Sequence, residues 1–354
     1  MNVDTKLRLI LYAPHEFGGR AAKTAEGVLR YRPEAAVCVV DPVKAGLTSG
    51  AVIGAGGSVP VVSTMEEAIA LGADAVLLGC AFAGGRMPQT WRDDILKAIN
   101  NRLCIINGLH DFLIEDSEFA SAAKSMNVAL IDLRMPPEKL NIATGKAASV
   151  KAHTVLTVGS DCSVGKMTTS LELLAAARKA NRPSRFVATG QTGIIIDGCG
   201  VAIDRVIGDF MAGVVEDLVL DAAAGAEYVF IEGQGSIIHP GYSGVTLSIL
   251  HGAAAECLIL CHQEGRITTG ESDHVIPKLS ILVETYEDLA RFIRPTKVVG
   301  IAIDSRSIAS DADARARIEE YSKETGLPVT DPVRFGAANI FKAIESYCST
   351  ACKR

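Results

Sequence analysis

Hydrophobic and polar positions along residues 1–134 form a regular succession of short apolar runs and amphipathic stretches. The apolar runs are continuous rather than alternating, which is typical of parallel strands buried on both faces of a sheet. Between the runs, stretches such as 64–73 and 91–100 carry apolar residues at helical spacing. The expected strands are 7–13, 35–41, 59–62, 74–79, 103–107 and 128–133. This order predicts a Rossmann-like, doubly wound α/β domain.

A second α/β unit is expected after residues 135–152, a stretch that opens with two prolines and lacks periodicity. We interpret this stretch as a linker and divide the chain into domains 1–148 and 149–354. A helix is expected to close the chain at 337–352. The apolar runs of the second unit lie at 153–160, 184–190, 227–233, 255–262 and 296–304. The fold class is therefore α/β, with two doubly wound domains.

Composition limits the kinds of function. The chain has 354 residues, 48% of them hydrophobic, and a net charge of −6, which favours neither a nucleic-acid nor a membrane partner. Charges interrupt every long apolar stretch, and the N-terminus does not resemble a signal peptide. The nine cysteines include no Cys-x-x-Cys pair. We therefore expect a cytoplasmic protein with neither a metal site nor disulfides.

The clearest motif is GSDCSVGKMTTS at residues 159–170. It lies between an apolar run and an amphipathic stretch, the strand–loop–helix setting of a phosphate-binding loop. Loop amides and the helix N-terminus form an anion site, and Lys166 adds a point charge. The second domain is therefore expected to be P-loop NTPase-like. Its expected phosphate-binding residues are Gly159, Ser160, Asp161, Cys162, Ser163, Val164, Gly165, Lys166, Met167 and Thr168.

The motif departs from the usual pattern at two positions. Ser160 stands where the first glycine is usual, and Met167 stands where a Ser or Thr hydroxyl normally binds Mg²⁺. Thr168 supplies a hydroxyl for a metal only if the first helical turn is shifted. Phosphate binding is therefore favoured over magnesium-dependent phosphoryl transfer.

Two further loops follow expected strands of the second unit. The sequence EGQGSIIHPGYS places Glu232 at the carboxyl end of a buried strand, where ligands of α/β proteins bind. A third loop, ATGQTGI at 188–194, is expected at the same edge. Polar candidates for substrate contact in these loops are Thr189, Gln191, Thr192, Ser236, Tyr242 and Ser243.

These motifs together carry a resemblance. GSDCSVGK with EGQG resembles dethiobiotin synthetase-type enzymes, which use ATP and magnesium. Over nearly its full length, with GGRMPQTWR, NGLHDFL and TGQTGI as further marks, the chain resembles the DgcN-type D-glutamate N-acetyltransferase family. That family, long labelled as of unknown function, combines a Rossmann-like N-terminal domain with a P-loop C-terminal domain.

The resemblance implies transfer of acetyl from acetyl-CoA to the amino group of a D-amino acid, D-glutamate, in D-amino acid catabolism. The loop would then hold phosphates of CoA, for which Met167 is no obstacle. The alternatives are an ATP- and Mg²⁺-dependent kinase or ligase resembling dethiobiotin synthetase, and a non-catalytic nucleotide sensor. The sequence leaves both a monomer and a homo-oligomer open.

Acetyl transfer to an amine requires a base, donors for the oxyanion and protonation of the leaving thiolate. Glu232 and His239 are the candidates for acid–base work, and Gln234 for the oxyanion. Two carboxylates of the substrate require cations, for which Arg86 and His110 are the first candidates, with Arg205 and Arg266 as further options.

Other polar residues receive less specific interpretations. Asp209 and Glu216 are seven apart on one expected helical face, which we interpret as surface. His262 and the segment 272–277 resemble a lid or a substrate-side loop, in which Asp273 and His274 rank as weaker catalytic candidates.

Overall fold

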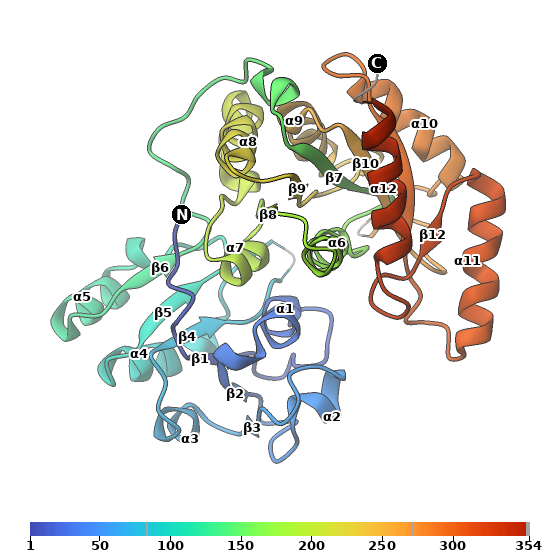
Figure 1. Cartoon of the computed structure of the whole chain (residues 1–354). Helices are drawn as coiled ribbons and strands as arrows, with labels where there is room; N and C mark the ends of the chain where they lie inside the picture. The colour runs from blue at the N-terminus through green and yellow to red at the C-terminus, as the bar shows by residue number, and fades with distance from the viewer. Residues whose placement is uncertain (83, 271, 352–354) are drawn as a thin grey trace. The chain divides into compact units, whose positions relative to one another are not determined.

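The computed structural model describes residues 1–82, 84–270 and 272–351, which form two compact units (Figure 1). Unit 1 comprises Met1–Pro137 and Gly190–Arg205. Unit 2 comprises Glu138–Thr189 and the described residues from Val206 onward. The expected division at residue 148 differs from this one in two places. Residues 138–148 group with unit 2, and the segment 190–205 returns to unit 1.

Unit 1 is built on a parallel sheet whose described strands run in the order β3-β2-β1-β4-β5-β6. The reversal between β1 and β4 is the switch point of a doubly wound fold. Every residue of β1 and β4 is buried, which confirms the interpretation of the continuous apolar runs. The strands are β1 (Leu9–Tyr12), β2 (Ala36–Val40), β3 (Val61–Val62), β4 (Ala75–Leu78), β5 (Cys104–Asn107) and β6 (Leu130–Asp132).

The helices of unit 1 follow the predicted alternation, with two additions. Helix α5 begins after Asp116, whose carboxylate caps two amides of the first turn, and ends at Asn127 in the left-handed conformation. The short helix α2 (Ser49–Ile53) was not expected, and neither was α7 (Gln191–Asp197). The others are α1 (Lys23–Tyr31), α3 (Met65–Ala70), α4 (Arg92–Asn100) and α5 (Ser117–Met126).

Unit 2 contains a second parallel sheet, with its described strands in the order β12-β11-β10-β7-β9-β8. The strand that leads into the P-loop, β7, lies between β10 and β9. The two-residue β12 was missed because so short a strand shows no period. The strands are β7 (His153–Gly159), β8 (Ser184–Val187), β9 (Tyr228–Ile231), β10 (Cys257–Gln263), β11 (Lys297–Asp304) and β12 (Val329–Thr330).

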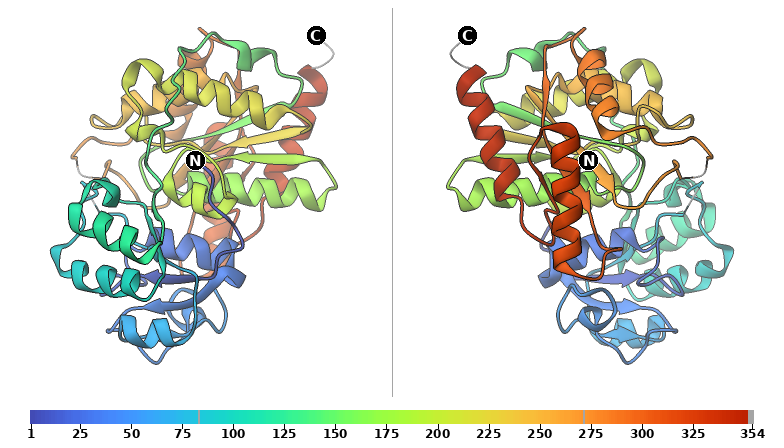
Figure 2. Two further views of the ribbon diagram at one scale, coloured as in Figure 1. Left: turned by 90° about the vertical axis from the view of Figure 1, so that its left-hand side faces the viewer. Right: turned by 90° about the vertical axis from the view of Figure 1, so that its right-hand side faces the viewer.

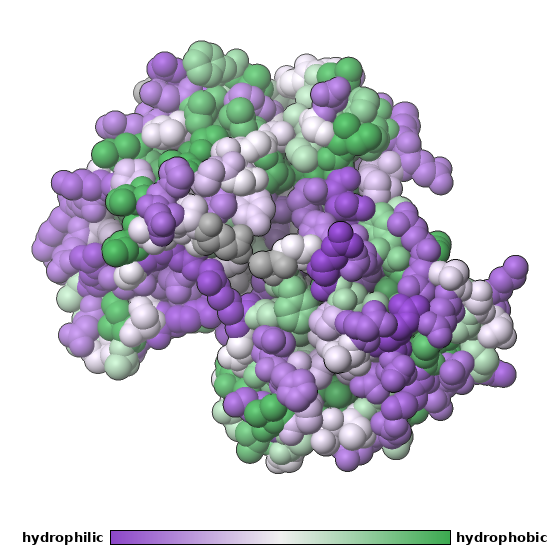
Figure 3. All heavy atoms as spheres, turned by 180° about the vertical axis from the view of Figure 1, so that it is seen from behind, coloured by the Kyte–Doolittle hydropathy of each residue, from purple (hydrophilic) through white to green (hydrophobic). Residues whose placement is uncertain are grey.

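Helices cover the sheet of unit 2, and α12 packs beside α6 (Figure 2). Helix α11, at the right of Figure 1 and the left of Figure 3, presents a mainly hydrophilic surface. Among the described residues, no helix is both long and apolar enough to cross a bilayer. The helices are α6 (Lys166–Lys179), α8 (Gly208–Ala223), α9 (Ser243–Ala253), α10 (Leu279–Ala290), α11 (Asp311–Thr325) and α12 (Ala338–Ala351).

The expected linker is not a free connection, because residues 138–152 are part of unit 2 and pack on α8. The amide and hydroxyl of Thr144 each donate to Glu216 Oε1 at 2.8 Å. Burial raises the pKa of Glu216, but the hydrogen bonds from Thr144 and from the amides of Lys146 and Ala147 together outweigh it, and the pKa is lowered overall. The surface interpretation is therefore wrong for Glu216, which is buried, although Asp209 is exposed.

Candidate functional site

The P-loop connects the end of β7 to the start of α6. Ser163 and Gly165 have φ values of 55° and 92°, so the backbone curls in the left-handed region on both sides of Val164. Helix α6 begins at Lys166, whose first amides have no acceptor within the helix. The Nζ atom of Lys166 is buried and donates to the carbonyl oxygen of Asp161 at 2.7 Å. Burial lowers the pKa of Lys166. These features form an anion-binding arrangement.

A clamp from the segment after β10 holds this loop. The fully buried Asp161 accepts hydrogen bonds at Oδ2 from Arg266 Nη1 and from the Gly270 amide, both at 2.7 Å. Arg266 also donates to the carbonyl oxygen of Cys162 at 2.7 Å. Arg266, considered from the sequence as a substrate cation, is therefore occupied with the loop itself.

His262 contacts the P-loop from the neighbouring strand β10 and is not part of a lid. It lies in β10, buried, with Nδ1 at 2.8 Å from Ser160 Oγ. Burial lowers the pKa of His262 to about 4, so the ring is neutral at physiological pH. The segment beyond it folds back on itself, with the Thr269 amide donating to the His274 carbonyl at 2.9 Å. Asp273 and His274 are exposed.

The hydroxyls of Thr169 and Ser170, near the start of α6, face the interior of unit 2. Thr169 Oγ1 accepts from Cys261 Sγ at 3.5 Å, and Ser170 Oγ donates to the Ile231 carbonyl at 3.2 Å. Met167 and Thr168 are both half-buried at the start of α6. The hydroxyls of Thr169 and Ser170 are therefore committed to packing, and Thr168 is left as the nearest candidate for a metal.

Glu232 and Thr189 join two strand ends next to Lys166. The Thr189 amide donates to Glu232 Oε2, and its hydroxyl donates to the Glu232 carbonyl, each at 2.9 Å. Gln234 was predicted to donate to the oxyanion. In the structure its side-chain amide donates to the Thr189 carbonyl instead. Gly233 passes so close to β7 that a Cβ would lie 1.7 Å from the Thr157 carbonyl oxygen. That contact requires glycine at the strand end.

His239 links two loops through both ring nitrogens. Nδ1 accepts from the Gly241 amide at 3.1 Å, and Nε2 lies 2.8 Å from the Gly270 carbonyl oxygen, so Nε2 carries the proton. Its ring lies 4.6 Å from that of Tyr242, which is 40% exposed. Ser236 is fully buried, and Ser243 begins α9. The geometry gives His239 a structural task in addition to the expected catalytic one.

The remaining expected residues belong to unit 1. Arg86 is 84% exposed at its side chain and pairs with Asp111 at 2.9 Å. Burial lowers the pKa of His110, which lies 3.6 Å from Asp204. Helix α7 forms where a third loop was expected, and the residues predicted for that loop belong to different units. Gln191 and Thr192 are buried in unit 1, where Thr192 Oγ1 lies 2.9 Å from Thr24 Oγ1, whereas Thr189 is in unit 2.

Two groups of supporting residues were missed from the sequence. Tyr286 donates to the Gly159 carbonyl at 2.7 Å and accepts from the Ile237 amide at 3.1 Å, so it joins the P-loop to the loop of His239. In unit 1, the buried Arg134 donates to the Gly108 carbonyl at 2.7 Å and pairs with Asp204. No local motif could have predicted Tyr286 or Arg134, because their hydrogen-bond partners are distant in sequence.

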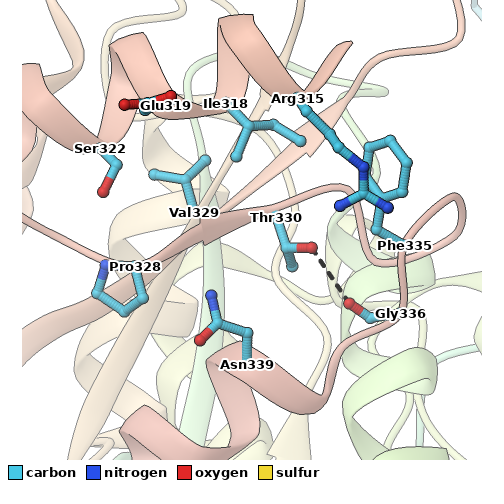
Figure 4. A pocket seen from close by; sticks show the side chains of 10 residues that line it. All are labelled: Arg315, Ile318, Glu319, Ser322, Pro328, Val329, Thr330, Phe335, Gly336 and Asn339. Carbon is cyan, nitrogen blue, oxygen red and sulfur yellow. Dashed lines mark hydrogen bonds between the residues drawn. The ribbon is translucent and has the colours of Figure 1, made fainter. Parts of the chain in front are cut away.

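A surface hollow of about 440 Å³ lies between α11, β12 and α12 (Figure 4). Arg315 lies over the Phe335 ring at 4.0 Å, and Thr330 Oγ1 donates to the Gly336 carbonyl at 3.2 Å. β12 is separated from β7 by two strands, and the lining contains no expected site residue. The hollow is therefore not part of the candidate site.

Comparisons with known proteins agree with this architecture. Residues 42–136 match the family model described as the DUF1611_N Rossmann-like domain, and residues 141–341 match the DUF1611_C P-loop domain, both labelled domains of unknown function. A crystal structure of a DUF1611 family protein from Anabaena variabilis superposes with a TM-score of 0.92 at 34% identity. The match covers 96% of this chain and 99% of that one.

Two curated relatives are named D-glutamate N-acetyltransferase. The protein from Tritonibacter scottomollicae is 36% identical over 92% of this chain and 94% of its own length. The protein from a Pseudoalteromonas species is 40% identical over 77% of this chain and 82% of its own length. The resemblance drawn from the motifs is confirmed, and the chain belongs to the DUF1611 family of proteins with a Rossmann-like and a P-loop domain.

Proposed function

We propose that the protein transfers an acetyl group from acetyl-CoA to the amino group of D-glutamate. The two relatives that carry this name cover most of the chain at 36% and 40% identity, and they support both the reaction and the substrate. Because acetyl-CoA is a metabolite of the cytoplasm, the reaction also favours a cytoplasmic enzyme.

The observation that carries the cofactor assignment is the P-loop itself. Its curled backbone, the start of α6 and the buried Lys166 fit a phosphate of CoA. Met167 has no hydroxyl, and the hydroxyls of Thr169 and Ser170 are bonded to other groups, so a catalytic magnesium would depend on Thr168 alone. We therefore favour a phosphate ligand without catalytic magnesium. The ATP-dependent alternative needs a hydroxyl for magnesium at the start of α6, and Met167, Thr169 and Ser170 do not supply one.

Glu232 is the proposed general base for the substrate ammonium, held by the Thr189 amide. It also lies near Lys166, since a Cβ on neighbouring Gly233 would be 3.3 Å from Lys166 Cδ. An extended pantetheine arm carries the thioester roughly 15 Å from the diphosphate, by ordinary bond lengths. Glu232 lies beside the P-loop, where the diphosphate would bind. It can act as the base at the thioester of the same CoA molecule only if the pantetheine arm folds back over the loop.

Kinetics of Glu232→Gln separate the two roles. A base gives about a 100-fold loss of kcat with little change in CoA affinity. A residue beside the phosphates changes CoA affinity and leaves kcat at saturation near the wild-type value. Glu172→Gln, on α6 and outside the candidate site, is the control, and we expect it to match the wild type.

The function is tested by mixing the protein with acetyl-CoA and D-glutamate and following free thiol, with mass spectrometry of the product. We expect thiol release and N-acetylglutamate in equal amounts. When CoA replaces acetyl-CoA, we expect no increase in thiol over time and no N-acetylglutamate. L-Glutamate and a panel of other D- and L-amino acids define the specificity. Absence of thiol release with every amino acid would exclude the proposal, and magnesium-dependent ADP formation from ATP would favour the alternative.

A further inference from the structure

A second group of reactive side chains lies at the amino end of β7, opposite the P-loop. His153 is the first residue of β7, Glu256 immediately precedes β10, and Cys348 lies on α12. The His153 Nδ1 atom, a carboxylate oxygen of Glu256 and the Cys348 Sγ atom all lie within 4.8 Å of one another. Since β7 spans seven residues, roughly 20 Å separate this group from the loop. The proposed acetyl transfer does not use it.

A fourth donor, Cys257, neighbours this group as the first residue of β10. Its thiol interacts with that of Cys348, which also interacts with His153, but Cys257 is not among the residues whose ligand atoms all lie within 4.8 Å of one another. His153 Nδ1 lies 2.8 Å from Glu256 Oε2. Cys257 is 0% and Cys348 1% exposed, whereas the side chains of His153 and Glu256 are 20% and 10% exposed. The group thus has a buried thiol side and an accessible polar side.

Two thiols, an imidazole and a carboxylate form the donor set of zinc sites. We propose that His153, Glu256 and Cys348 bind one Zn²⁺ ion and that the neighbouring Cys257 thiol moves in to complete tetrahedral coordination. In such a site the ligand atoms lie roughly 3.3 to 3.8 Å apart, so the His153–Glu256 contact opens by about half an ångström. Zinc with two thiolates and one carboxylate carries a single negative charge. Arg294, which donates to the Ala254 carbonyl at 3.2 Å, supplies a positive charge nearby.

In a second group, Asp161, Cys162 and His239 at the P-loop, the ligand atoms also lie within 4.8 Å of one another. It is the poorer zinc site for two reasons. Both ring nitrogens of His239 are bonded to backbone groups, and the Asp161 carboxylate is paired with Arg266 at 2.7 Å. It also offers one thiol rather than two. These differences favour the amino-end group and make Cys162 a natural control.

The proposed ion has a structural role. Its ligands come from β7, β10 and α12, which are about 100 residues apart along the chain. Zinc that binds the folded chain and not the unfolded one raises the unfolding temperature. We expect a rise of about 5 °C at saturating zinc, with acetyl transfer by the wild type little changed.

Cobalt(II) substitution tests the site on the full chain. Protein that has been reduced and treated with chelator is titrated with Co²⁺. We expect one equivalent to give tetrahedral visible bands and a thiolate-to-cobalt charge-transfer band, both removed by Zn²⁺. Cys348→Ser and Cys257→Ser should each weaken the charge-transfer band by about half or abolish it, and Cys162→Ser should leave it unchanged.

The proposal is overturned if the wild type gives no charge-transfer band, or if the band is lost in Cys162→Ser and retained in Cys348→Ser. If Cys348→Ser does not fold, as judged by circular dichroism, the titration of Cys257→Ser and His153→Gln decides, and unchanged spectra in both refute the site. A disulfide between Cys257 and Cys348 in protein isolated without reductant, with no cobalt bound after reduction, also refutes it.

Discussion

The two ends of β7 carry opposite chemistry. At the carboxyl end, backbone amides and Lys166 create a site for an anion, and the Asp161–Arg266 pair fixes the loop. At the amino end, His153 meets Glu256 and Cys348, a set of donors suited to a soft cation. One strand therefore positions two groups with different ligands. The first is made of consecutive residues, and the second is assembled from three distant segments.

The largest expected effect tests how strongly the Asp161–Arg266 pair stabilises the fold at the carboxyl end of β7. Arg266→Ala leaves the Asp161 carboxylate buried without its cation and should reduce the free energy of unfolding by about 3 kcal/mol. Denaturant unfolding followed by circular dichroism measures the loss. The control is Arg291→Ala, which breaks an exposed pair with Asp288 and should cost less than about 1 kcal/mol. Equal losses in both variants would contradict the role of the clamp.

A smaller effect is expected when the anion site loses its charge. Lys166→Ala should weaken CoA binding about 30-fold, or about 2 kcal/mol, because a charge-assisted contact to phosphate is removed. Isothermal titration calorimetry with CoA measures the change. Lys179→Ala, at the exposed end of the same helix, is the matched control and should bind CoA as the wild type does. Unchanged affinity in Lys166→Ala would mean that the cofactor binds elsewhere. The cobalt spectrum of Lys166→Ala should equal that of the wild type, which would show that the two ends act separately.

The smallest expected effect depends on pH and concerns the support beneath the loop. The pKa of His262 is lowered from 6.5 to about 4 in the folded chain, so the unfolded chain binds the proton more readily between these values. The stability contributed by the neutral ring is present above pH 6.5 and is lost as the pH falls towards 4. Between pH 7.5 and 5.5 the loss from this group is about 1 kcal/mol.

Thermal unfolding at both pH values measures this dependence in wild type and in His262→Gln. The variant should show a smaller drop on acidification than the wild type. His274→Gln, which changes an exposed ring, should show the wild-type drop. If His262→Gln loses as much stability on acidification as the wild type, another group dominates the pH response.

The apolar runs were sufficient to predict most of the strands, because a strand buried on both faces is continuous in sequence. The runs at 7–13, 153–160 and 296–304 correspond to β1, β7 and β11 with ends within two residues. The pattern failed where packing between distant segments decides. Residues 138–152 lack a period and were interpreted as a linker, yet they bind α8 through Thr144 and Glu216.

The candidate site divides in the same way. The P-loop was visible because its residues are neighbours in the chain, and Met167 indicated the missing metal hydroxyl. The partners of the loop were not visible. Arg266, His262 and Tyr286 reach it from about 100 residues away, and their functions in the site follow only from the fold. The catalytic role of His239 stays a prediction, to which the fold adds that both of its ring nitrogens are engaged by backbone groups.

The sequence by itself determined the α/β class, the P-loop and the family, because periodicity and contiguous motifs are local properties of the chain. Only the tertiary structure decided which unit the segment 190–205 belongs to, what clamps Asp161, and that His153, Glu256 and Cys348 meet. These arrangements depend on how distant segments pack. The free energy of each such contact comes from burial and pairing, which no single stretch of sequence contains.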